Sequence, residues 1–232
     1  MKQFLNKNIL IDKSWANIFH DLRDDVSLIE RMISKTSYKP DTENVFRVFE
    51  LPLEDIKVVI LGQDPYPNGN DATGIAFELN NYNDWLTPTK NTSLINILKE
   101  LYFETTNNRD SIFTIRTKIK TSEFEIFKPN EIFQKWRNNG VFMLNTSLTC
   151  AENTPNSHEK IWSSFMWKII IKIATNKNDV KWLLWGNEAK KFIPLIKISG
   201  NNQIHESVHP SKKEFINSGA FKQVIKNYCI TK

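Results

Sequence analysis

The sequence has little of what a disulfide-stapled, metal-bound or membrane-spanning protein needs. Its 232 residues include two cysteines and four histidines, with no close Cys/His cluster. So few cysteines exclude a disulfide framework or a Cys-rich zinc site. No stretch approaches the roughly 18–20 apolar residues of a membrane span, and the opening MKQFLNKNIL lacks the apolar core of a signal peptide. We therefore expect a soluble, cytoplasmic protein with reduced cysteines, no metal and no membrane partner.

Signatures of several common enzyme classes are also missing. Residues 61–70 contain neither GxGxxG nor GxxxxGK[ST], so dinucleotide and P-loop nucleotide binding lose support. There is no Gly-x-Ser-x-Gly nucleophile elbow. The H-x-E and P-C-x-x-C pair of zinc deaminases is absent too.

What is present is an ordinary globular composition with uneven charge. Hydrophobic residues make up 40% and charged residues 25%, as in typical folded domains. Residues 151–232 hold 13 Lys, no Arg and 6 acidic residues, a net charge of +7; since the whole chain carries +5, the first 150 residues carry −2. A basic C-terminal third favours a polyanionic partner such as nucleic acid. An AT-rich genome, which favours Lys, Asn and Ile codons, explains the lysines as well.

Short apolar runs alternating with amphipathic segments predict an α/β fold in one domain, residues 1–232. Buried strands are predicted at 57–61, 141–144, 182–185 and 204–208, and helices at 15–22 (capped by Ser14), 28–33, 93–102, 162–173 and 221–228. Strands joined by helices run parallel with right-handed crossovers. We therefore expect a three-layer α/β/α fold around a central, mainly parallel four-stranded sheet. Residues 1–13 are expected to form a loose start, and 104–130 a peripheral insertion with hairpin character.

Polar residues follow the predicted strands. Asp64 lies in the turn GQDPYP after the first strand, and Asn145 comes after the second. His209 follows the fourth strand in the run His-Pro-Ser. Each of these alone is more often a cap, a turn former or a partnered histidine. Because ligands of such folds bind at the carboxyl ends of the strands, the convergence of carboxylate, amide and imidazole favours a functional site.

The segments KVVILGQDPYP…GIAF, GVFMLNTSLT, NSH…W, WLLWG and SVHPS resemble the family 1 uracil-DNA glycosylases, in family order and at family-like spacing. The likeness runs from about Trp15 to Tyr228, and GQDPY with LNT and HPS is a specific combination. The resemblance implies a glycosylase-like fold and a monofunctional hydrolase. Such an enzyme flips deoxyuridine out of DNA and hydrolyses the N-glycosidic bond. It leaves an abasic site for base-excision repair, without metal or organic cofactor.

The resemblance also implies catalytic and base-binding roles. Asp64 would position and polarise the attacking water and stabilise the cationic sugar, while His209 would hydrogen-bond uracil O2 as negative charge develops there. Asn145 and the backbone amide of Gln63 would contact the uracil edge. Tyr66 would exclude the thymine methyl. Phe77 would be the aromatic on which the flipped base stacks.

Contacts with DNA are expected from a second set of residues. Small residues fall where the family holds phosphates, at Ser93, Gly186 and Ser211, and Pro65 is expected to contact DNA as well. The leucine that wedges into the duplex in the family is replaced by Lys213. Either Phe215 acts as the wedge or flipping is passive. Lys212 and Lys213 would strengthen phosphate binding or simply form a solvated charged loop.

Two further departures from the family pattern bear on activity. Pro67 replaces the histidine that helps hold the catalytic water in most bacterial and animal members, which predicts a reduced rate. Asn91-Thr92-Ser93 replaces the usual Pro-Pro-Ser, and residues 104–130 exceed the family length. The replacement at 91–93 and the extra length of 104–130 bear on DNA affinity more than on the base pocket.

These departures keep two alternatives open. One is a low-activity or inactive DNA- or partner-binding protein on a glycosylase fold. The other is a glycosylase with a single-strand or altered base preference, because single strands need no plug. The expected partners are uracil-containing DNA, single- or double-stranded, and an acidic DNA-mimic protein inhibitor. The chain is expected to be a monomer, located in the nucleus or a virus factory if its source is eukaryotic or viral.

Overall fold

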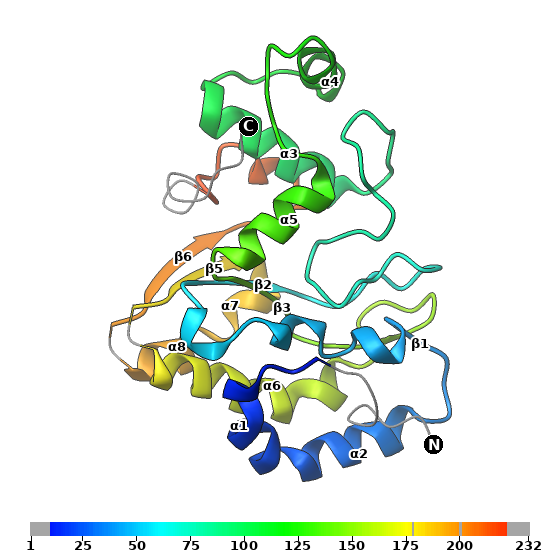
Figure 1. Ribbon diagram of the computed structural model, residues 1–232, viewed down its shortest axis with the longest axis vertical. Helices are drawn as coiled ribbons and strands as arrows, with labels where there is room; N and C mark the ends of the chain where they lie inside the picture. Colours follow the sequence, from blue (N-terminus) through cyan, green and yellow to red (C-terminus); the bar gives the residue numbers. More distant parts are fainter. Residues whose placement is uncertain (1–9, 178, 200, 222–232) are drawn as a thin grey trace.

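A four-stranded parallel sheet lies at the centre of the computed structural model, which describes residues 10–177, 179–199 and 201–221 (Figure 1). The strand order is β3-β2-β5-β6, with every neighbouring pair parallel. The strands are β2 (Val58–Gly62), β3 (Val141–Asn145), β5 (Lys181–Trp185) and β6 (Gln203–Ser207). The predicted α/β fold with a four-stranded parallel sheet is confirmed. A small antiparallel pair, β1 (Tyr38–Lys39) and β4 (Cys150–Ala151), was not predicted.

Helices cover both faces of the sheet (Figure 1). On one side lie α1 (Ala16–Asp21), α2 (Arg23–Ile33), α6 (Glu159–Asn176) and α8 (Ile193–Ile196); on the other lie α3 (Thr92–Thr106) and α5 (Pro129–Asn138), with α4 (Ile112–Lys120) outside them. The short α7 (Asn187–Lys190) follows β5. The described residues also form short 3-10 helices, which are η1 (Lys13–Trp15), η2 (Thr42–Asn44), η3 (Arg47–Glu50), η4 (Leu53–Asp55), η5 (Lys197–Ser199) and η6 (Lys213–Phe215).

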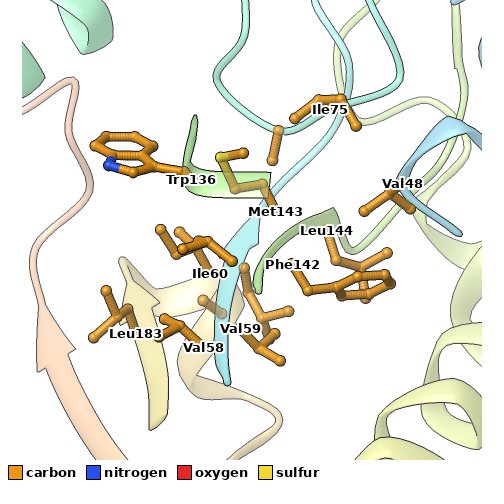
Figure 2. Close-up of a cluster of buried hydrophobic side chains, with 14 of the residues drawn as sticks. Val48, Val58, Val59, Ile60, Ile75, Trp136, Phe142, Met143, Leu144 and Leu183 are labelled. Atoms are coloured by element: carbon orange, nitrogen blue, oxygen red, sulfur yellow. The ribbon is translucent and has the colours of Figure 1, made fainter. Parts of the chain in front are cut away.

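The two central strands are apolar along their length because both of their faces are covered. All five residues of β2 and of β3 are buried. Figure 2 shows the alternation: Ile60 and Met143 lie on the side of Trp136, and Phe142 lies on the side of Val48. Side chains of a strand alternate between faces, so β2 and β3 contribute to the packing of both helical layers.

Two helix starts differ from prediction. Ser14 does not cap a helix: its backbone N–H donates to Oδ1 of Asp12 at 2.9 Å, so Asp12 is the cap. The hydroxyl oxygen of Ser14 instead accepts from the Leu53 N–H at 2.9 Å. Helix α3 begins at Thr92 under the cap of Asn91 and continues to Thr106.

The hairpin predicted within 104–130 is wrong. This stretch contains the end of α3, all of α4 and the start of α5. The alternation in IFTIRTKIK suits a strand, but Ile112, Ile115 and Ile119 also recur at helical spacing. Ser111 caps α4 by accepting from the Thr114 N–H at 3.1 Å, which favours the helix.

Two predictions fall wholly or partly outside the described residues. Of the loose start at 1–13, only residues 10–13 are described, and there the Asp12 N–H donates to the Phe49 carbonyl at 3.0 Å. The helix predicted at 221–228 lies beyond the described residues from 222 onward. Within the described ranges, no helix is long and apolar enough to cross a membrane, and no group of three or more His, Cys, Asp or Glu side chains could hold a metal ion.

Candidate active site

A cavity of about 130 Å³ opens at the carboxyl ends of β2, β3 and β6. Its wall combines residues from far-apart parts of the chain. Residues predicted from sequence to form the site and found lining this cavity are Gln63, Asp64, Pro65, Tyr66, Phe77, Ser93, Asn145 and His209. Pro67, which stands at the family's histidine position, also lines it. The parallel sheet brings these residues together because its strand ends share one edge.

Asp64 is half-buried and is held by the loop that precedes α6. Its Oδ2 accepts a hydrogen bond from the Asn156 backbone N–H at 2.7 Å. Burial raises the pKa of the Asp64 carboxyl above its ordinary value, and the Asn156 N–H opposes that rise. Gln63 donates from Nε2 to Oδ1 of Asn156 at 2.5 Å. Asn156 has φ +61°, a left-handed conformation that asparagine tolerates better than most residues.

Asn145 presents a buried side-chain amide to the cavity. The residue is 5% exposed and ends β3, paired in register with Gly62. A Cβ at Gly62 would come within 2.4 Å of Oδ1 of Asn145, so only glycine fits beneath the amide. Among the described residues, the side chain of Asn145 has no hydrogen-bond partner. The amide faces the cavity with donor and acceptor groups that no protein group uses, so it is suited to a ligand with a complementary edge.

His209 is held as a neutral imidazole with a defined tautomer. The Ser211 backbone N–H donates to Nδ1 at 3.1 Å, and the Ser211 Oγ lies 2.8 Å from the same nitrogen. A backbone N–H can only donate, so Nδ1 accepts and the neutral ring carries its proton on Nε2. Burial lowers the pKa of His209, and the nearby Lys212 cation lowers it further. His209 therefore offers an Nε2–H donor rather than a full charge.

Phe77 occupies a backbone conformation that requires support. Its φ is +67°, which for a bulky residue stores about 1–3 kcal/mol of strain. The Tyr66 hydroxyl donates to the Phe77 carbonyl at 3.2 Å, and the Ala76 N–H donates to the Met143 carbonyl at 3.1 Å. Burial raises the pKa of Tyr66, so its hydroxyl keeps its proton. The Phe77 ring is half-buried and lies 5.3 Å from the Trp185 ring and 6.1 Å from that of His209.

A second cavity of about 240 Å³ adjoins the first and shares Gln63 and His209 with it. Three residues predicted to bind DNA line it, namely Gly186, Ser211 and Lys212. Gly186 has φ +94°, and a Cβ there would lie 2.9 Å from the Cβ of His209. Gly186 is therefore required for the close approach of the histidine loop, independently of any phosphate contact.

The wedge prediction for Phe215 is wrong. Its side chain is 0% exposed and packs edge-on against Trp185 at 5.1 Å between ring centroids, with Phe221 at 6.3 Å. Inserting it into a duplex would empty a core position, at a cost of about 3–5 kcal/mol. Lys213, at the family's leucine position, is exposed and lines neither cavity.

Several supporting residues were not found from the sequence. Asn156 contacts Asp64 through its backbone N–H. Almost every residue type has this group, so the sequence could not show the contact. His158 is buried with Nδ1 2.9 Å from Oγ1 of Thr149, and this oxygen also accepts from the Trp162 indole at 2.7 Å. Only the run Asn-Ser-His hinted at this loop.

Comparison with known proteins identifies the family. The family model described as "Uracil DNA glycosylase superfamily" matches residues 49–228. The chain belongs to this superfamily and is a glycosylase of the hydrolase class.

Solved structures extend the likeness to nearly the whole chain. A variant of mimivirus UNG in complex with UGI is 25% identical with TM-score 0.68, over 90% of this chain and 73% of that one. The mimivirus uracil-DNA glycosylase is 24% identical with TM-score 0.66. It covers 89% of this chain and 71% of that one. UNG from Nitratifractor salsuginis is 22% identical with TM-score 0.77, over 95% and 92% of the two chains, and shows that the fold is shared.

Proposed function

We propose that this protein is a monofunctional uracil-DNA glycosylase, releasing uracil from DNA and leaving an abasic site for base-excision repair. The observation that carries this proposal is the meeting of Asp64, Asn145 and His209 in one cavity. A carboxylate, an unpartnered amide and a neutral imidazole donor supply the three interactions that excision of a pyrimidine requires.

The bond between sugar C1′ and base N1 breaks with its electron pair moving onto the base. The sugar becomes cationic, and the Asp64 carboxylate stabilises it. Water then attacks C1′, and Asp64 takes up the proton that the water loses. The anionic base carries charge on O2, where the Nε2–H of His209 donates. Loss of one such donor typically lowers a rate about 10²–10³-fold.

Base selection follows from the pocket wall. The Asn145 amide can donate and accept in fixed directions, so cytosine would leave it mispaired, and mispaired buried groups reject a ligand strongly. Tyr66 lines the same cavity, and its ring is proposed to exclude the thymine methyl. We expect Tyr66→Ala to admit thymine while Tyr66→Phe, which loses only the hydroxyl, does not. Retention of thymine rejection by Tyr66→Ala would contradict the pocket assignment.

The DNA strand would run past the second cavity. Ser93 on the first cavity, with Ser211, Gly186 and Lys212 on the second, supports phosphate contacts on both sides of the flipped nucleotide. Flipping a base requires a few kcal/mol, and stacking on Phe77 would offset part of it.

The buried Phe215 and the exposed Lys213 favour a strand preference. Without an apolar wedge, a base that is already unpaired is the easier substrate. We therefore propose that single-stranded or mismatched deoxyuridine is preferred over U:A pairs. The basic C-terminal third also supports binding of an acidic DNA-mimic inhibitor. A variant of mimivirus UNG forms a complex with UGI.

The test is excision from a labelled oligonucleotide with one deoxyuridine, in single-stranded, U:G and U:A forms, followed by alkaline cleavage of the abasic site. We expect cleavage in the order single-stranded, U:G, U:A, and none with Asp64→Asn. Equal rates in all three forms would contradict the strand preference. No cleavage in any form, with DNA binding intact, would favour a binding protein on a glycosylase fold.

A further inference from the structure

The segment 107–128 lies within the stretch 104–130 that the sequence predicts to be a peripheral insertion, and it is fixed to α3. Lys118 donates from Nζ to the Tyr102 hydroxyl and to Oδ2 of Asp110, both at 2.7 Å, and the Tyr102 hydroxyl donates to the same oxygen at 2.5 Å. Ile115 on α4 is 0% exposed, and the Phe124 ring packs edge-on against Tyr102 at 5.0 Å. This face of the segment is part of the packed structure.

The opposite side of the same segment holds the loop formed by residues 82–92. Arg116 donates from Nε to the Trp85 carbonyl at 2.7 Å and from Nη2 to the Thr87 carbonyl at 3.0 Å. The Trp85 indole donates back to the Phe127 carbonyl at 2.8 Å. No ion pair of Arg116 occurs in the part of the chain that the structure describes. Its guanidinium donates to carbonyl oxygens of the 82–92 loop.

The 82–92 loop leads directly to the cavity. The Tyr82 hydroxyl donates to the Thr87 carbonyl at 3.1 Å. Beyond Thr87, Oγ1 of Thr89 accepts from the Asn91 N–H at 3.0 Å, and Oδ1 of Asn91 caps α3 by accepting from the Leu94 N–H. Ser93, in the first turn of α3, lines the cavity.

The middle of this loop has no core of its own. Thr87, Pro88 and Lys90 are exposed, and the chain there reads Thr-Pro-Thr-Lys-Asn-Thr. Exposed polar loops of this kind are the easily opened parts of a structure. The contacts that order its base come from Tyr82 and from the 107–128 segment.

We propose that Arg116 is a positioning residue for DNA binding, holding the 82–92 loop so that Ser93 and the start of α3 meet a DNA phosphate. This inference rests on the proposed function. Arg116 acts through the loop rather than by touching the substrate. The hydrogen bonds of Arg116 and the bond between the Trp85 indole and the Phe127 carbonyl restrain a loop that has no core of its own.

The test compares Arg116→Met with Lys120→Met. Lys120 lies one turn further along α4, is exposed, and has no side-chain partner among the described residues, so it matches the loss of charge without the loss of contacts. Two readouts are needed: amide hydrogen exchange of 82–92, and the Kd and KM for a single-stranded oligonucleotide containing deoxyuridine. Arg116→Lys, which keeps the charge and can reach one carbonyl, serves as the conservative variant.

We expect Arg116→Met to lose exchange protection in 82–92 while β2 keeps its protection, with Kd and KM rising on the order of tenfold and kcat little changed. Arg116→Lys should fall between wild type and Arg116→Met, and Lys120→Met should leave loop protection unchanged and affect Kd much less.

Unchanged protection in Arg116→Met would overturn the inference, and so would an equal rise in Kd for Lys120→Met. Loss of protection without a change in Kd would overturn the role in DNA binding. Should the wild-type protein bind DNA without excising uracil, the exchange and Kd measurements still decide the inference, so its failure and that of the proposed function are distinguishable.

Discussion

At the residue scale, the site depends on Asp64 and His209, whose pKa values are shifted in opposite directions. Burial raises the pKa of Asp64 from its ordinary value of 3.8, and burial with Lys212 lowers that of His209 from 6.5. The active form has Asp64 ionised and His209 neutral. Both conditions fail as the pH falls, so both groups contribute to the acid side of the pH profile.

The first prediction is therefore an acid limb in kcat/KM to which both Asp64 and His209 contribute, since kcat/KM reports the free enzyme. In His209→Gln only Asp64 remains to titrate, so the limb of the slower variant should lie above 3.8. The measurement is kcat/KM against pH for both proteins. A variant midpoint at or below 3.8 would contradict the assignment.

The second prediction concerns the left-handed residue that holds Asp64. Asn156→Gly and Asn156→Val both remove the Oδ1 that accepts from Gln63. Asn156→Gly keeps φ +61° and the N–H donor to Asp64, so it should be the faster of the two variants. Asn156→Val disfavours this conformation. Loss of the donor should lower the rate and move the acid limb to higher pH, because that N–H lowers the pKa of Asp64. Identical pH profiles for the two variants would show that the donor does not tune Asp64.

At the element scale, α3 organises the site. Its first turn carries Ser93, and further along Asn96 donates from Nδ2 to the Pro210 carbonyl at 2.7 Å and to that of Lys212 at 3.2 Å. Glu100, 0% exposed, accepts from the backbone N–H groups of Asn217, Gly219 and Ala220. One helix face therefore holds the loop that carries His209.

The third prediction tests this anchor. Glu100→Ala leaves three backbone donors without their acceptor and should reduce the free energy of unfolding by about 1–3 kcal/mol. It should also lower kcat, because the His209 loop loosens. Glu100→Gln keeps the shape of the side chain and one acceptor oxygen, so its free energy of unfolding and its kcat should lie between those of the wild type and Glu100→Ala. Urea unfolding and steady-state kinetics measure both effects; a destabilised Glu100→Ala with unchanged kcat would remove the link to His209.

The elements also show how far sequence reasoning reaches. Strand β2 was predictable because VVILG has no polar position and two covered faces leave a continuous apolar run. Helix α4 was missed because Phe113, Ile115 and Ile119 fit the alternation of a strand, whereas Ile112, Ile115 and Ile119 fit the spacing of a helix. The cap at Ser111 decides between them. Phe215 was misjudged because its distance from His-Pro-Ser does not reveal that η6 turns the ring inward onto Trp185.

At the scale of the whole molecule, the sheet separates two aromatic groups. On one side Trp15, Phe49 and Phe142 pack within 5.6 Å of one another between neighbouring ring centroids. Elsewhere Trp185 packs on Phe221 at 5.1 Å. The site residues come from loops over this rigid base, and their meeting was predictable only because parallel strands end at one edge. The partner of each polar group depends on packing that no local pattern encodes.

The fourth prediction uses the charge of the whole molecule. Lys212 lines the second cavity, so Lys212→Ala should weaken DNA binding and reduce the slope of log K against log salt by about 0.7 for single strands. Lys172, near the end of α6 and 3.6 Å from Asp21, lies at the opposite end of the sheet, and Lys172→Ala should leave the slope unchanged. Equal effects of the two variants would indicate that DNA binding does not use the second cavity.

The most direct test of the central claim is the release of free uracil, followed by mass spectrometry under single-turnover conditions on a single-stranded oligonucleotide containing one deoxyuridine. The account predicts stoichiometric uracil from the wild-type protein, a loss of at least about 10² in rate for His209→Gln, and no detectable uracil from Asp64→Asn, with DNA binding retained in all three. Uracil release that survives Asp64→Asn, or none from the wild-type protein, would contradict it.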